Sequence, residues 1–217
     1  MNLSEMNPLH LAVIMAGMGL LPLLFMVTTA FLKIAVVLVI VRNALGVQQV
    51  PPNMVLYGIA VALTLYVMTP VFAEMQNEIN HIDLKDVSSA TIAEHFEKGT
   101  APLKSFISKH SDPAVRETFV SSTKELWPKE MSKDVSHEDF IILIPAFVIS
   151  ELQSGFEIGF LIYLPFVVID LIVSNLLLAL GMQMVAPMTV SLPFKILLFV
   201  IAEGWQKLLH SLVLSYV

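Results

Sequence analysis

The stretch LIYLPFVVIDLIVSNLLLALGMQMVAP, residues 161–187, decides the class of this protein. Its first twenty residues are almost entirely apolar, and Asp170 is the single carboxylate near their centre. A helix of twenty residues rises about 30 Å, which is the thickness of the hydrocarbon core of a bilayer. The stretch therefore predicts a membrane helix, followed at Gly181 by a tight turn that carries Met182 and Met184.

The composition extends this prediction to the whole chain. Of the 217 residues, 56% are hydrophobic and only 14% are charged, whereas a soluble domain has roughly 25% charged residues. Residues 11–32 and 54–73 are two uncharged runs of 22 and 20 residues, and two further apolar segments lie between residues 140 and 202. We expect an all-α polytopic membrane protein with about four long apolar helices.

The charged residues divide the chain into three regions. Residues 74–139 contain 13 acidic and 8 basic residues, whereas the entire chain contains 18 and 12. We therefore expect an apolar helical hairpin over residues 1–73, a soluble acidic insertion over 74–139, and a second apolar hairpin over 140–217.

The insertion shows helix signals and no convincing strand, so we expect two or three short helices in it. One amphipathic pattern ends at Gly99, which predicts a helix stop there. Another begins with Asp112 as a candidate N-cap and Pro113 at the first helical position. Histidines are scattered through the insertion without the close spacing of a metal site, which favours solvated surface residues: His81, His95, His110 and His137.

The orientation of the chain follows from the short loop at residues 41–53. This loop contains Arg42 and no acidic residue, so the positive-inside rule places it in the cytoplasm and the insertion on the other side. The N-terminal residues lack the basic start of a signal peptide, so we expect the first segment to be retained. The chain has no cysteine, which excludes disulfides and thiolate metal sites.

Charged and proline residues inside the apolar segments are the next unusual feature. A charge at the centre of a bilayer costs at least about 2.5–3.5 kcal/mol, so such groups usually pair or face water. Prolines in or beside the apolar runs predict interrupted helices, enclosed by protein or beside a water-filled cavity. The charged residues are Lys33, Glu151, Glu157, Asp170 and Glu203, and the prolines are Pro22, Pro70, Pro145, Pro165, Pro187 and Pro193.

We interpret the five charged residues as buried ion pairs. For Asp170 we favour a salt bridge to Lys33, within or between subunits, and a proton relay is the alternative. A snorkelling Lys33 and a Glu203 at the membrane interface remain open as simpler explanations.

Three stretches together resemble the FliP/YscR family, the export-gate proteins of bacterial type III secretion systems. They are VRNALGVQQVPPN at 41–53, PAFVISELQSGFEIGF at 145–160 and LPFVVIDLIVSNLLLALGMQMVAP at 164–187. The resemblance implies bent helical hairpins that assemble, as five copies with FliQ-like and FliR-like proteins, into a helical pore complex of the inner membrane. Unfolded secreted polypeptides pass through such a pore, and the insertion lies on the periplasmic side. The chain is similar to the injectisome branch of the family, which serves virulence.

The same resemblance assigns a role to the turn after residues 179–181. In the family this loop is a methionine-rich gasket around the closed pore, and Met182 and Met184 match it, with Met188 nearby. Gly181 and Pro187 flank the loop, and Gln183 stands where many relatives have another methionine. Flexible, polarizable thioethers suit a ring that closes around many different chains, and an apolar constriction excludes water. Ordinary core packing is the alternative role for these methionines.

No catalytic motif supports an enzyme. The chain lacks a Gly-rich phosphate loop, an HExxH pair and a GxSxG elbow. We therefore expect a non-catalytic secretion subunit with no cofactor, no metal and no nucleic-acid partner. The alternatives are a small secondary transporter that uses Lys33 and Asp170 at the midplane, and a membrane anchor whose acidic domain binds another protein.

Overall fold

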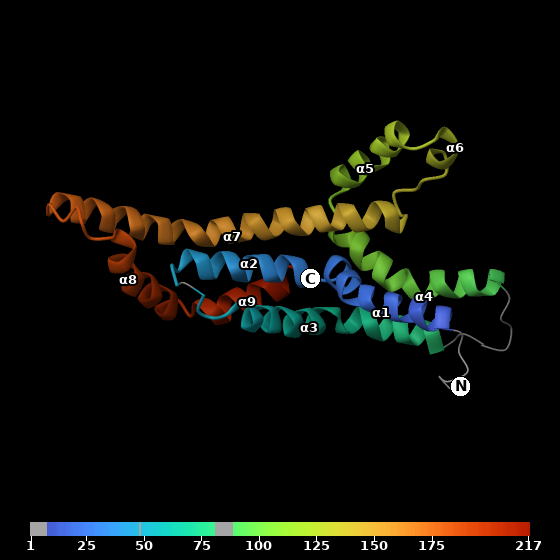
Figure 1. Ribbon diagram of the computed structural model, residues 1–217, viewed down its shortest axis with the longest axis horizontal. Helices are drawn as coiled ribbons and strands as arrows, with labels where there is room; N and C mark the ends of the chain where they lie inside the picture. Colours follow the sequence, from blue (N-terminus) through green and yellow to red (C-terminus); the bar gives the residue numbers. More distant parts are fainter. Residues whose placement is uncertain (1–7, 48, 81–88) are drawn as a thin grey trace.

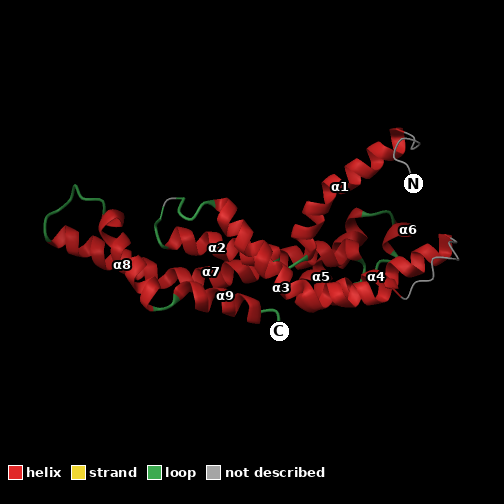
Figure 2. Ribbon diagram, turned by 90° about the horizontal axis from the view of Figure 1, so that it is seen from below, coloured by secondary structure: helices red, strands yellow, loops and turns green. Residues whose placement is uncertain are grey.

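The computed structural model describes residues 8–47, 49–80 and 89–217, and this part of the chain contains helices and no strand. The molecule is elongated, and the long helices run roughly along its length (Figures 1 and 2). The all-α prediction is therefore confirmed. In chain order the helices are α1 (Pro8–Thr28), α2 (Phe31–Ala44), α3 (Asn53–Asn80), α4 (Ser89–His110), α5 (Pro113–Leu126), α6 (Lys129–Ser132), α7 (Phe140–Ala179), α8 (Pro187–Ile201) and α9 (Gly204–Leu214).

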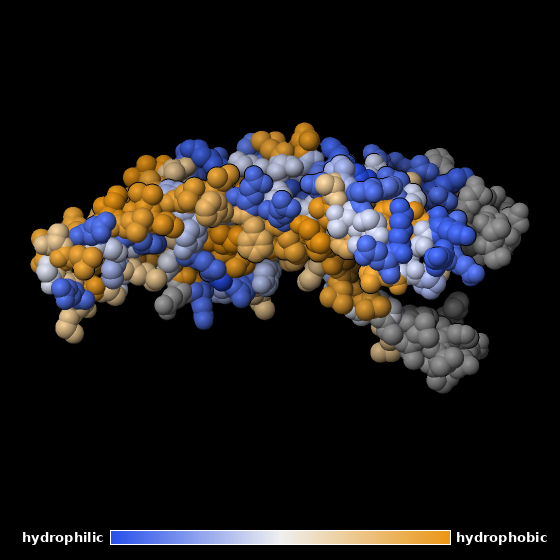
Figure 3. Space-filling model, turned by 90° about the horizontal axis from the view of Figure 1, so that it is seen from above, coloured by the Kyte–Doolittle hydropathy of each residue, from blue (hydrophilic) through white to orange (hydrophobic). Residues whose placement is uncertain are grey.

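Two to four segments of the described chain could cross a membrane. By length and composition, α3 and α7 each qualify alone, and the bent pairs α1–α2 and α8–α9 qualify if each pair is one span. Within the qualifying windows, only 22% of α3 and 11% of α7 are buried in the chain. Apolar surface therefore covers much of the molecule, whereas hydrophilic residues gather at the end where α4, α5 and α6 lie (Figure 3). The chain is a membrane protein whose outer helix faces need lipid or other subunits to cover them.

The sequence predicted one straight span over the uncharged run at residues 11–32, and this prediction is wrong. The chain bends by 71° between α1 and α2. The hydroxyls of Thr28 and Thr29 donate hydrogen bonds to the carbonyls of Leu24 and Phe25, at 2.7 and 2.6 Å. Such bonds from a threonine to the preceding turn bend a helix, which explains why hydropathy alone missed the break.

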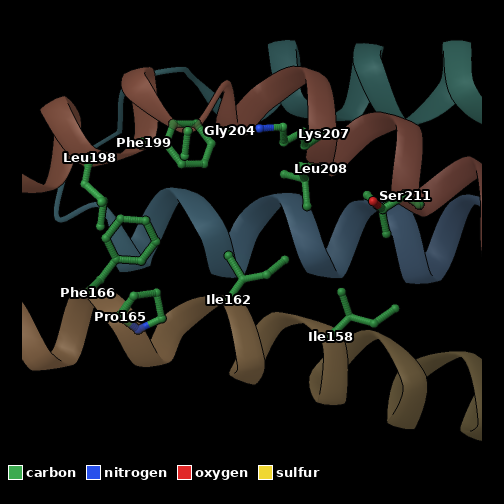
Figure 4. A pocket seen from close by; sticks show the side chains of 12 residues that line it. Ile158, Ile162, Pro165, Phe166, Leu198, Phe199, Gly204, Lys207, Leu208 and Ser211 are labelled. Atoms are coloured by element: carbon green, nitrogen blue, oxygen red, sulfur yellow. The ribbon is translucent and has the colours of Figure 1, made fainter.

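A second bend of 60° separates α8 from α9. Glu203 adopts a left-handed backbone conformation there, with φ of 54°. The ring of Phe199 packs against Gly204 so closely that a Cβ at this glycine would lie 2.3 Å from a ring carbon. Phe199 faces Phe166 of α7 (Figure 4). It also contacts Trp205 edge to face at 5.3 Å, so aromatic packing holds the elbow.

The helices continue through their prolines, so the predicted interruptions at these residues are wrong. Neighbouring turns and packing compensate for the backbone donor that each proline lacks. Pro187 differs from the others because it occupies the first turn of α8, where a missing N–H costs little. Of the prolines in the apolar segments, those inside helices are Pro22, Pro70, Pro145, Pro165 and Pro193. Pro102 of the insertion also lies inside a helix, α4.

Helix α2 forms the centre of the core. Its residues Ile34, Val37 and Leu38 are completely buried. Helix α7 runs beside it (Figure 1), and two glycines allow close approach. A Cβ at Gly155 would lie 3.5 Å from the backbone of α2, and one at Gly159 would lie 2.5 Å from the Ile40 side chain. Small residues four apart are a recognised seam between membrane helices.

The acidic insertion contains α4, α5 and α6. The expected cap of α5 is confirmed: the Asp112 carboxylate accepts a hydrogen bond from the Ala114 N–H at 2.7 Å, and Pro113 follows at the first helical position. The expected helix stop at Gly99 is wrong, since α4 continues to His110. Gly99 lies against Ile79 of α3, and this packing outweighs the low helix propensity of glycine.

The ends of the insertion and the loop before α3 bear on three further predictions. The expected boundary after residue 73 falls inside α3, which continues to Asn80. Arg42 closes the loop after α2 through hydrogen bonds to the Pro51 carbonyl and the Asn53 side chain. The side of the membrane on which this loop lies stays a prediction. His81 lies outside the described residues.

The seam between α2 and α7 generates a first prediction. Gly159→Ala forces Ile40 to move and should destabilise the protein by about 1–3 kcal/mol. Gly58→Ala is the matched control, because nothing lies within 4 Å of its Cβ position, and it should stabilise α3 by about 1 kcal/mol. Thermal unfolding in detergent measures both variants. If the two substitutions shift the midpoint in the same direction, the seam does not limit the approach of the helices.

Candidate functional site

A buried ion pair joins α2 to α7. The Lys33 ammonium lies 3.2 Å from Glu151, and the two side chains are only 4% and 2% exposed. The Tyr216 hydroxyl donates a hydrogen bond to the other oxygen of the Glu151 carboxylate and lies 3.2 Å from the Ala30 carbonyl. The Lys33 ammonium also lies 3.6 Å from the centre of the Tyr216 ring, which adds a cation–π contact. The ammonium and the hydroxyl compensate for the buried carboxylate, and the ring compensates for the buried ammonium.

The C-terminal end of the chain connects this pair to the insertion. The Tyr216 ring stacks on Phe106 of α4 at 5.9 Å and lies 5.2 Å from the His110 ring. Burial lowers the pKa of the His110 imidazole, and the positive charges of Lys33 and Lys109 lower it further. The Phe106 carbonyl, 2.8 Å from Nδ1 of His110, acts in the opposite direction. His110 therefore serves as an aromatic packing partner that is neutral above its lowered pKa.

A second ion pair joins α7 to α8. The Lys195 ammonium lies 2.6 Å from Asp170, and their side chains are 4% and 36% exposed. The hydroxyl of the buried Ser191 donates to the other Asp170 oxygen at 2.6 Å. Lys195 also donates to the Ala44 carbonyl at 3.2 Å. This carbonyl is at the C-terminal end of α2, where backbone acceptors are unpaired and the helix dipole favours a cation.

These contacts correct the predicted partner of Asp170. Within the chain, Asp170 pairs with Lys195 and Lys33 pairs with Glu151, so the expected Lys33–Asp170 bridge within a subunit is wrong, and a bridge between subunits stays a prediction. Each carboxylate takes the nearest ammonium that packing places on a facing helix. Glu203 is exposed and lies 3.7 Å from Lys207, one helical turn further on. Glu157 is exposed and has no salt bridge within the described residues, so neither glutamate is buried in the single chain.

The turn between α7 and α8 is built around Gly181. This glycine has a φ of 73°, the left-handed conformation that favours glycine. Its N–H donates to the Leu178 carbonyl at 3.0 Å, and the Met182 N–H donates to the Leu177 carbonyl at 2.9 Å. These two bonds are the Schellman motif, which satisfies the last carbonyls of a helix. The Val185 N–H then donates to the Met182 carbonyl at 3.4 Å, which closes a second turn.

This geometry exposes the methionines of the turn to different degrees. The Met184 side chain is 100% exposed, and that of Met182 is 44% exposed. Met188 is 57% exposed, and its Cγ lies 3.9 Å from the position that a Cβ on Gly46 would occupy. Met188 therefore faces the loop after α2, whereas Met182 and Met184 lie on the turn itself. The turn lies at the end of the molecule remote from the insertion (Figure 1).

Several residues of this arrangement escaped the sequence analysis. Lys195 and Ser191 lie four apart, so a helix places them on one face, and this spacing was a usable signal. The small-residue pattern at 155–159 was another. Tyr216 offered no signal, because nothing in the sequence indicates that it reaches Glu151.

The Asp170–Lys195 pair generates a second prediction. Asp170→Ala leaves a nearly buried ammonium with only a carbonyl partner and should destabilise the protein by about 2–3 kcal/mol. Asp170→Ala combined with Lys195→Met removes the charge and should recover most of the loss. Denaturant unfolding and the assembly state of the purified protein check both variants. Normal stability and assembly of Asp170→Ala, with lost proton-coupled transport, would favour the relay instead.

The Tyr216 hydroxyl generates a third prediction. Tyr216→Phe keeps the ring but leaves one oxygen of the buried Glu151 carboxylate without its donor, which should cost about 1–3 kcal/mol. Tyr66→Phe is the control, since this side chain is 70% exposed, and its effect should stay within about 0.5 kcal/mol. Equal unfolding midpoints for the two variants would mean that the hydroxyl contributes nothing to the cluster.

Comparison with known proteins supports one family. The model of the FliP family matches residues 14–212. The chain is 52% identical to the harpin secretion protein HrcR of Erwinia amylovora over 216 residues, which cover 100% of both chains. It is 50% identical to the Yop proteins translocation protein R of Yersinia pestis over 212 residues, 97% of each chain. It is 44% identical to the virulence protein YscR of Salmonella typhimurium over 210 residues, 97% of each chain. These matches cover nearly the whole length, so this chain belongs to the FliP family.

Proposed function

We propose that this chain is a pore-forming subunit of a type III secretion export gate, through which unfolded proteins cross the bacterial inner membrane. Two relatives that are half identical over nearly the full chain are named for harpin secretion and Yop translocation. Proteins that share this much sequence share their fold, and a role in protein secretion follows from the family. The apolar helices agree with a place in the membrane.

Assembly with other subunits would cover apolar surface that the single chain leaves exposed. Large apolar side chains along α7 are exposed, among them Phe156, Phe160 and Leu171. A groove of about 1100 Å³ between α1, α2, α3 and α7 is also lined almost entirely by apolar residues. We propose that five copies, with FliQ-like and FliR-like proteins, cover these faces. The exposed Glu157 and Glu203 would then take partners from other subunits or face the pore.

The observation that carries the proposal is the turn after α7. The Schellman motif at Gly181 fixes the backbone, and Met184 projects from it with its apolar side chain fully exposed. A rigid turn that holds a flexible thioether away from the core suits a contact made outside the subunit. Five such turns around one axis would form an apolar constriction that closes by excluding water and yields to a passing polypeptide.

The arrangement of the chain across the membrane follows from the same proposal. The loop closed by Arg42 would face the cytoplasm, and the polar helices α4, α5 and α6 would lie on the periplasmic side. The acidic insertion would then surround the exit of the pore.

The alternative function, secondary transport, loses its principal support. It required Lys33 and Asp170 to form one site near the midplane. The two residues belong to separate ion pairs. Lys33 pairs with Glu151 near the start of α2, and Asp170 pairs with Lys195 near its end. Both pairs connect helices, which is a structural role.

The fourth prediction tests the gasket. Met182→Ala with Met184→Ala removes apolar bulk from each turn, so the closed ring should widen and conduct ions, while the complex still assembles. Conductance of the purified complex in planar bilayers measures the leak, and the mass of the complex measures assembly. Met131→Ala is the control, because this residue of α6 is also exposed, at 63%, but lies in the insertion. A double variant as tight as the parent would exclude the gasket, and failure to assemble would make these methionines packing residues.

A further inference from the structure

We propose that the turn between α7 and α8 is an oxidant-sensitive site, at which a two-electron oxidant such as hydrogen peroxide opens the closed pore. The site consists of the thioethers of Met184 and Met182. The proposal rests on the gating role of this turn, and it adds a chemical modification that would regulate the gate.

Access of the oxidant to sulfur is the first requirement. Met184 is 100% exposed, which is more than any other described methionine, and Met182 is 44% exposed. Met68 in α3, by contrast, is completely buried. The chain contains no cysteine, so no thiol of this protein competes for the oxidant. Since exposure governs the oxidation of methionine, Met184 should react first in the single chain, and in the assembled gate peroxide would reach it along the pore that the turns surround.

The reaction needs nothing beyond the oxidant. A lone pair of the Met184 sulfur attacks one peroxide oxygen, so an S–O bond forms as the O–O bond breaks. The departing hydroxide takes the remaining proton of the attacked oxygen and leaves as water. Sulfur is oxidised by two electrons to the sulfoxide, and the peroxide is reduced by the same two electrons. Methionine sulfoxide reductases reverse this modification.

The effect on the turn follows from polarity. Gln183 lies between the two methionines and already carries a polar amide. Oxidation of both neighbours would place a polar group on three successive residues, 182, 183 and 184. A sulfoxide oxygen in a closed apolar ring lacks a hydrogen-bond donor, which is unfavourable unless water enters. The modified ring should therefore wet and conduct, although the fold of the subunit is unchanged.

The backbone of the turn makes this effect local. The bonds from the N–H groups of Gly181 and Met182 to the last turn of α7 do not involve the thioethers. Met188 is more exposed than Met182, at 57%, but it belongs to α8 and lies against the loop at Gly46, so its oxidation should change the turn itself less. The oxidised turn should keep its shape and change only its surface.

The test uses the complete purified export complex in planar bilayers, with conductance recorded before and after hydrogen peroxide. Oxidation of each methionine is followed by peptide mass spectrometry. In the parent, Met184 should gain oxygen earlier than Met68, and conductance should rise roughly tenfold. Methionine sulfoxide reductase with a thiol reductant should restore the original conductance.

Two variants identify the responsible residues. Met182→Leu with Met184→Leu keeps apolar side chains but removes the reactive sulfur, so peroxide should not change its conductance relative to its own untreated value. Met131→Leu removes an exposed sulfur from the insertion, and its peroxide response should equal that of the parent.

Two outcomes would overturn the inference. One is a parent complex that stays closed while both turn methionines are fully oxidised. The other is a double leucine variant that still opens with peroxide. The Met182→Ala, Met184→Ala complex shows whether the oxidation hypothesis alone is wrong or the gasket hypothesis is wrong as well. If the alanine complex leaks and the oxidised parent does not, the gasket stands and only its sensitivity to oxidants is wrong.

Discussion

The buried carboxylate of Glu151 is the constraint on which the rest of the structure depends. A carboxylate that is 2% exposed among apolar helices is tolerable only if its charge and both of its oxygens have partners. Lys33 from α2 and Tyr216 from the end of the chain provide them. These residues come from the beginning, middle and end of the sequence. Their meeting therefore requires α2, α7 and the C-terminal residues to be correctly placed at the same time.

The second ion pair and the glycine seam complete this constraint along α2. Lys195 reaches the Ala44 carbonyl at one end of α2, whereas the Glu151 cluster contacts Lys33 near the other end. Between them, Gly155 and Gly159 let α7 lie directly on α2. In lipid, apolar side chains gain little by leaving one apolar environment for another, so polar contacts and close packing must specify the arrangement. The Glu151 cluster, the Asp170–Lys195 pair and the glycine seam specify the position of α2. The outer faces of α3 and α7 stay exposed.

Much of this fold could be predicted from composition and local signals. Hydropathy identified the apolar helices, and the Asp112–Pro113 pair marked the start of α5 correctly, because both signals are local in sequence. The bends at Thr28–Thr29 and Glu203 could not be predicted, since they depend on hydroxyl bonds and on the packing of Phe199 against Gly204. The partner of Asp170 was also out of reach. Several ammonium groups were candidates, and only the packed helices decide which one lies closest.

The core and the α7–α8 turn differ in how tightly their side chains are held, and this difference suits the proposed function. Around Glu151, every polar group is paired and the geometry tolerates little change. At the turn, the hydrogen bonds of the Gly181 and Met182 N–H groups fix the backbone, whereas the flexible side chains of Met182 and Met184 are 44% and 100% exposed. The proposed gate, which closes tightly and still admits chains of different shape, would require both properties in one subunit. The rigid core would hold the turns of neighbouring subunits at fixed positions, and the thioethers would adapt within the space that remains.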